Sequence, residues 1–62
     1  MERLYTAQEL ASCLSIPLAT LYRFNYLGTG PERIRVGRHV RYRESDVQRW
    51  LEANVTAHRG AA

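Results

Sequence analysis

The stretch LYTAQELASCLSIPLATLYRF, from Leu4 to Phe24, carries the pattern of two short helices interrupted by a proline. Thr6 followed three residues later by Glu9 is a capping box, in which a hydroxyl and a carboxylate accept hydrogen bonds from free amides at a helix start. Alanines and leucines then recur at positions 7, 10, 11 and 14, which is one apolar helical face. The pattern therefore predicts a first helix over 7–14.

The second half of this stretch predicts another short helix. Pro17 cannot continue the first helix, but it suits the first turn of a new one, where its missing N–H costs nothing. Leu21 and Phe24 have the spacing of an inward face, and Gly28 is placed to end the helix. We expect a second helix over 17–26, joined to the first by a tight turn.

A second stretch, RIRVGRHVRYR at 33–43, alternates apolar and cationic residues and predicts two strands joined at Gly37. A two-residue loop beginning at Gly37 would mix apolar and charged residues on both faces of the hairpin, although it is the commoner turn. A three-residue loop sets Val36 opposite Val40 and creates one apolar face. Because a buried face fixes the register of a strand pair, we expect the three-residue loop.

That register places arginines opposite one another. The expected cross-strand pairs are Val36 with Val40, Arg35 with Arg41, Ile34 with Tyr42, and Arg33 with Arg43. Like charges directly opposite each other destabilise a strand pair by a few tenths to about 1 kcal/mol. A bound polyanion would neutralise this repulsion, so this ladder of facing arginines indicates a polyanionic partner. Two alternatives stay open: a solvated arginine face, and codon bias in a GC-rich genome, since all nine basic residues are arginine.

The remaining residues predict a third helix and a tail. Acidic residues at 44 and 46 suit a helix start, and apolar residues at 47, 50, 51 and 55 recur at helical spacing. The helix should cover 44–53 or a little beyond, with Trp50 packed in the core. The whole is a small α+β fold: residues 1–55 form one domain and 56–62 a flexible tail.

Bulk composition limits the classes of protein that fit. Sixty-two residues make one small domain with a net charge of +3. The single cysteine, Cys13, allows no intrachain disulfide and no zinc cluster, and is expected to be buried or half-buried. No membrane span or signal peptide is apparent. We expect a protein of the bacterial cytoplasm, without cofactor or metal. No active-site spacing is apparent, so we do not expect an enzyme.

The order of elements resembles the winged helix-turn-helix domain of phage and plasmid excisionases and of AlpA-like prophage regulators. It is also similar to the DNA-binding head of the MerR family. The residues that carry the resemblance are LYTAQELASCLSIPLATLYRF, GTGP and RIRVGRHVRYRESDVQRWL, which together cover about residues 4–51. One departure is Ser15, at a turn position where many helix-turn-helix units have glycine.

The resemblance implies a docking mode on double-stranded DNA. The second helix would enter the major groove, and the hairpin wing would follow the backbone toward the next minor groove. Arg23 could take a guanine bidentately, while Arg38 at the wing tip could enter the minor groove. The expected DNA-binding residues are Leu18, Ala19, Thr20, Tyr22 and Arg23 on the helix, and Arg35, Arg38, His39 and Arg41 on the wing.

The resemblance also implies a role. An excisionase binds repeated sites on the flank of an attachment site, bends the DNA and helps a tyrosine integrase excise a phage or mobile element. The small size favours this role, and we expect head-to-tail contacts between neighbours on DNA. An AlpA- or MerR-like transcriptional regulator is the alternative within DNA binding. A protein-interaction module, with the arginines meeting an acidic protein, is the alternative from another class.

Overall fold

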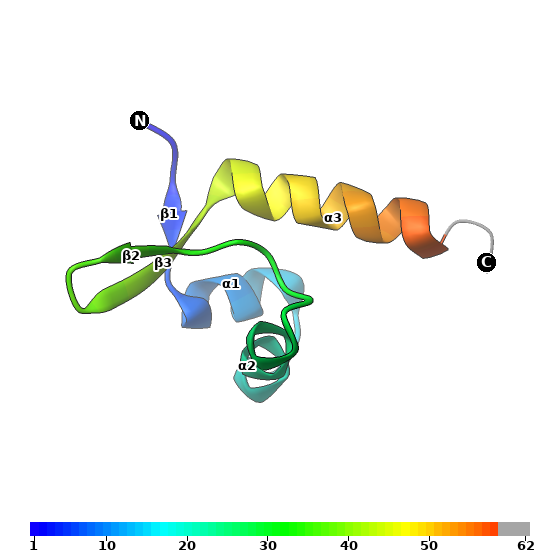
Figure 1. Ribbon diagram of the computed structural model, residues 1–62, viewed down its shortest axis with the longest axis horizontal. Helices are drawn as coiled ribbons and strands as arrows, with labels where there is room; N and C mark the ends of the chain where they lie inside the picture. The colour runs from blue at the N-terminus through cyan, green and yellow to red at the C-terminus, as the bar shows by residue number, and fades with distance from the viewer. Residues whose placement is uncertain (59–62) are drawn as a thin grey trace.

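The structure is a computed structural model that covers the backbone of residues 1–58 and the side chains of residues 1–54. The described residues form three helices and a small antiparallel sheet (Figure 1). The elements are β1 (Leu4–Tyr5), α1 (Ala7–Leu14), α2 (Leu18–Leu27), β2 (Ile34–Val36), β3 (His39–Arg43) and α3 (Glu44–His58). The predicted small α+β winged helix-turn-helix is confirmed: α1 and α2 form the two-helix unit, and β2 and β3 form the wing.

Local sequence signals define both ends of α1. The Thr6 hydroxyl accepts a hydrogen bond from the Glu9 amide at 3.0 Å, and the Glu9 carboxylate accepts one from the Thr6 amide at 2.9 Å. The capping box is thus confirmed. At the other end, Ser15 adopts φ 57°, a left-handed conformation that glycine takes more easily. The Ile16 amide then donates to the Ala11 carbonyl, which completes the turn into α2.

The second helix begins one residue later than predicted. Pro17 lies just outside it in an extended conformation, and Gly28 ends it with φ 73°. Five residues from α1, α2, β3 and α3 form the buried core: Leu10, Ala11, Leu21, Tyr42 and Val47. Tyr42, which the predicted pairing placed opposite Ile34, is 1% exposed and is among the largest fully buried side chains.

A third strand was not predicted. The lead-in residues Leu4 and Tyr5 form β1, which pairs with β3 in the register Leu4–Arg43, so the strand order is β1-β3-β2. The same segment supports the start of α3, because the Glu44 amide donates to the Arg3 carbonyl at 3.1 Å. A two-residue strand shows no alternation in sequence, so only the partner strand reveals it.

The predicted register of the wing is wrong. The strands pair Ile34 with Arg41, Arg35 with Val40 and Val36 with His39, around a two-residue loop of Gly37 and Arg38. The wing extends beyond the core, and Val36 and Val40 are 50% and 40% exposed. Because neither face of the hairpin is buried at these positions, burial does not select the register, and the geometry of the turn determines it. Gly37, with φ 63°, supplies the left-handed residue that a two-residue hairpin loop requires.

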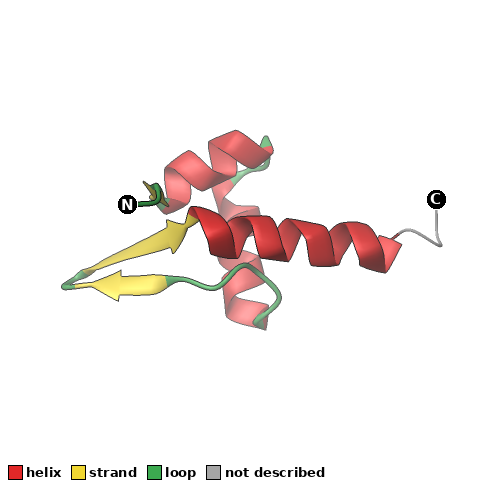
Figure 2. Ribbon diagram, turned by 90° about the horizontal axis from the view of Figure 1, so that it is seen from above, coloured by secondary structure: helices red, strands yellow, loops and turns green. Residues whose placement is uncertain are grey.

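The last helix is longer than predicted and extends beyond the two-helix unit (Figures 1 and 2). It continues through residues 56–58, which were expected in the tail, while 59–62 lie outside the described residues. Trp50, which was expected in the core, is half-buried and lies outside the buried cluster. Its ring centroid is 6.0 Å from that of Phe24, and its indole N–H donates to the Thr29 carbonyl. Leu51 and Cys13 are exposed, contrary to expectation.

Candidate functional site

The outer face of α2 presents three of its five predicted DNA-binding residues. Ala19, Tyr22 and Arg23 are exposed, and Tyr22 keeps 53% of its surface accessible, so it does not merely cover the core edge. Thr20 is half-buried. Leu18 is also half-buried and packs against the core, which differs from the outward position expected for it. The exposed face is therefore centred on Tyr22 and Arg23.

A groove of about 470 Å³ lies between α2, the start of α1 and the wing. Four of its lining residues were predicted to bind DNA: Tyr22, Arg38, His39 and Arg41. Others were not predicted to belong to the site, among them Gln8, Asn25 and Arg33. Asn25 lies one helical turn after Tyr22, a spacing that places both on one face of α2 and could have identified it.

The arginines of the wing do not form the expected ladder. Arg35 faces Val40, and Arg41 faces Ile34, so the two arginines point to opposite faces of the hairpin. Arg41 also donates to the carbonyl of its neighbour Val40 at 2.8 Å. Like charges across the strands are thereby avoided, and the wing carries a cation on each face.

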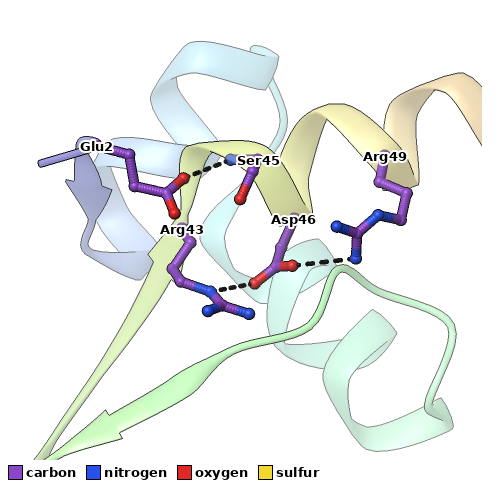
Figure 3. Close-up of polar contacts among 5 residues, drawn as sticks. All are labelled: Glu2, Arg43, Ser45, Asp46 and Arg49. Carbon is purple, nitrogen blue, oxygen red and sulfur yellow. Dashed lines mark hydrogen bonds and ion pairs between the residues drawn. The ribbon is translucent and has the colours of Figure 1, made fainter.

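Two further arginines are bound by a carboxylate inside the protein. Asp46, whose side chain is 1% exposed, accepts from Arg43 Nε at 2.6 Å and from Arg49 at 3.3 Å (Figure 3). The hydrogen bond and charge of Asp46 raise the pKa of Arg43. Arg43 and Asp46, like Asp46 and Arg49, are three residues apart, a spacing that predicts an ion pair within a helix. The pair with Arg43 was not predicted, because Arg43 ends β3 and the helix begins only at Glu44.

Two further carboxylates, those of Glu2 and Glu9, cap helices. Glu2 accepts a hydrogen bond from the Ser45 amide at 2.9 Å, at the start of α3 (Figure 3). That backbone hydrogen bond lowers the pKa of Glu2, and the one from the Thr6 amide lowers the pKa of Glu9. Both carboxylates thus favour their charged form in the folded protein.

A set of five arginines on α2 and the wing stands apart from these pairs. Within the part of the chain that the structure describes, none of them forms an ion pair closer than 4 Å. These five, called the free arginines below, are Arg23, Arg33, Arg35, Arg38 and Arg41. They surround the groove or lie on the two elements that form it. The arrangement is suited to several phosphates at once, since a guanidinium donates two parallel hydrogen bonds to an oxyanion.

A metal site has no comparable cluster of side chains among residues 1–54. No three His, Cys, Asp or Glu side chains of that range gather as metal ligands would. None of the described helices combines the length and the apolar character needed to cross a membrane. His39 lies on the exposed wing.

Comparison with known proteins places the chain among helix-turn-helix domains. The family model described as "Helix-turn-helix domain" matches residues 4–55, which is most of the chain. Comparisons with curated proteins and with solved structures found no match.

Proposed function

The chain belongs to the helix-turn-helix domain family, and on that premise we propose that this DNA-binding protein is an excisionase. It binds specific sites on the flank of the attachment site of a phage or mobile element. By bending the duplex there, it helps a tyrosine integrase to assemble the excision complex in the bacterial cytoplasm.

The free arginines are the observation that carries this proposal. They occupy both α2 and the wing, on either side of one groove. The buried carboxylate of Asp46, by contrast, pairs with Arg43 and Arg49. With α2 in the major groove, Tyr22 and Arg23 meet base edges and Ala19 meets thymine methyls. The wing then lies along the backbone, where Arg35, Arg38 and Arg41 contact phosphates.

A protein held this way bends DNA if its two contact surfaces do not lie along a straight duplex. A helix in one groove and a hairpin beside the next groove contact the DNA over a longer path when the duplex curves toward the protein. Bending a site costs on the order of 1–6 kcal/mol, which the added contacts offset. The free arginines provide those contacts on both surfaces.

The first test is the dependence of binding on salt. Each phosphate neutralised by an arginine releases counterions, with a slope of about −0.9 in log affinity against log salt. Five contacts therefore give a slope of about −4 to −5 for a duplex enriched by the protein from a random-sequence pool. Retention of an acidic protein but of no duplex at moderate salt would indicate the protein-interaction module instead.

The second test separates the excisionase from a regulator. Footprinting combined with circular permutation, on the flank of the attachment site of the element that encodes the protein, measures both site number and bending. Several adjacent protected sites with strong bending support the excisionase. One unbent site overlapping a promoter identifies an AlpA- or MerR-like transcriptional regulator.

Adjacent sites also bring neighbouring molecules together. We expect cooperative head-to-tail contacts between them on DNA and no stable two-fold dimer in solution. Sedimentation at low micromolar concentration without DNA tests this expectation, because a robust dimer would contradict it.

A further inference from the structure

One hydrogen bond connects the recognition helix directly with the wing. The Asn25 side-chain amide on α2 donates to the Tyr42 hydroxyl on β3 at 2.5 Å. The two residues are 17 positions apart, and both line the groove between α2 and the wing. Among the described residues, no other side-chain hydrogen bond joins α2 to the hairpin.

The backbones of α2 and the wing are otherwise little in contact. The helix packs mainly on α1, whereas the hairpin packs on α1, β1 and α3. The position of the wing relative to α2 is thus determined through intermediate elements, through the shared core that contains Leu21 and Tyr42, and through this direct hydrogen bond. Tyr42 is 1% exposed, so its ring is immobilised and its hydroxyl forms a fixed anchor.

The surroundings of Asn25 restrict its amide. A Cβ atom added to Gly30 would lie 3.1 Å from Asn25 Oδ1 and 3.2 Å from Phe24 Cβ, which shows how closely the loop covers the amide. Asn25 Oδ1 is itself buried and has no hydrogen-bond partner. A buried acceptor without a donor costs stability, and such costs concentrate where a side chain serves a purpose other than stability.

We infer that Asn25 is a positioning residue. Its amide, packed under Gly30 and bonded to Tyr42, holds the wing at the angle to α2 at which both contact one duplex. This inference rests on the proposed DNA-binding mode. When two contact surfaces are held rigidly at the correct angle, binding of one favours binding of the other and the affinity rises. If their relative position is less well defined, part of that affinity is lost.

The test removes the anchor without touching the surface that meets DNA. Tyr42→Phe keeps the buried ring and deletes only the hydroxyl. We expect it to weaken binding to the enriched duplex by roughly threefold to tenfold, the equivalent of one neutral hydrogen bond, and to reduce the bend. The matched control is Tyr5→Phe, because Tyr5 pairs with Tyr42 across β1 and β3 and packs against the core, but it lies outside α2 and the wing and its hydroxyl has no described hydrogen bond; it should bind as the parent does.

Double-mutant cycles distinguish positioning from a general loss of stability. If the hydroxyl holds the wing in place, Arg38→Ala should cost less affinity in the Tyr42→Phe background than in the parent, since the wing contact is already impaired. Arg23→Ala on α2 should cost the same in both. Additive effects of Tyr42→Phe with Arg38→Ala would overturn the inference, because independent sites add.

A second variant keeps the test decisive if Tyr42→Phe unfolds. Gly30→Ala crowds the Asn25 amide from the side of the loop, and Gly30 lies outside the left-handed region, so alanine fits its backbone. It should show the same coupling to Arg38→Ala, and additive effects for it would also overturn the inference. Failure of the parent chain to bind any duplex at low salt would instead contradict the proposed function. Equal binding and bending by parent and Tyr42→Phe would contradict only the role of Asn25.

Discussion

The two ends of the wing carry arginines in opposite surroundings. At its base, Arg43 and the nearby Arg49 of α3 share the carboxylate of Asp46, which is almost completely buried (Figure 3). Toward its tip, Arg35 and Arg38 are exposed, and neither has an ion-pair partner among the described residues. One residue type thus serves two purposes within a single hairpin.

The difference separates arginines whose charge holds the fold together from arginines that we propose bind DNA. An arginine beside a buried carboxylate is already neutralised and holds β3 to α3. An arginine without such a partner keeps its charge for an external anion. Counting arginines in the sequence therefore overstates the surface available to DNA, and the set of free arginines is the better measure.

Asp46→Ala should give the largest effect of any single change to these residues. It leaves Arg43 and Arg49 without their shared partner. Only the Asp46 carboxylate is buried, and the side chains of Arg43 and Arg49 are 42% and 73% exposed, so the loss of the two charge-assisted hydrogen bonds should lower the free energy of unfolding by up to about 3 kcal/mol. Denaturant unfolding measures this loss. Gln48→Ala, an exposed change on the same helix, should have little effect, and equal stability of the two variants would contradict the structural role of Asp46.

Arg23→Ala tests the opposite class of arginine. It should cost about 1–3 kcal/mol of binding to the preferred duplex and relax the choice of sequence, because a base contact is lost. Stability should stay close to that of the parent, since Arg23 is exposed. Arg49→Ala is the matched control, and binding titrations on preferred and scrambled duplexes should show no change in its selectivity. If Arg23→Ala and Arg49→Ala both lost sequence selectivity, the distinction between free and ion-paired arginines would be wrong.

Arg38→Ala should have a smaller effect, of a different kind. As a phosphate contact at the wing tip, it should weaken binding to all sequences about equally and reduce the salt slope by about 1. Titrations at several salt concentrations measure the slope. A slope identical to that of the parent would place the wing tip away from the backbone.

The pH dependence of stability should be the smallest effect, and it concerns the residues that stabilise the fold and not those proposed to bind DNA. The pKa values of Glu2 and Glu9 are lowered from their ordinary value of 4.5 by backbone hydrogen bonds. The unfolded chain therefore binds protons more readily, so this stabilisation is complete above pH 4.5 and is lost as the pH falls through the folded-state values. Thermal unfolding in acid should show a flatter pH profile for Glu9→Gln. An unchanged profile would contradict the capping role of Glu9.

Signals confined to a few neighbouring residues were sufficient to predict the bounds of the first two helices. The capping box at Thr6 and Glu9, the proline at 17 and the glycine at 28 each act within one helical turn, so α1 and α2 were predicted within a residue at each end. The resemblance to winged helix-turn-helix domains implied an outward position for Tyr22, Arg23 and Leu18, and the first two are exposed whereas Leu18 packs against the core. The family match agrees with that order of elements.

The tertiary structure alone decided what depends on distant or solvent-exposed partners. The hairpin register followed from the turn at Gly37, because the wing extends past the core and no buried face was present to select the predicted pairing. The strand at Leu4 exists only through β3, and Asn25 reaches Tyr42 only after α1 has brought α2 and the sheet together. The sequence by itself thus determined the three helices, the two strands of the wing and their order along the chain, since these arise from neighbouring residues. Which arginines remain free for DNA was settled by packing, since a charge is neutralised only by the carboxylate that folding places beside it.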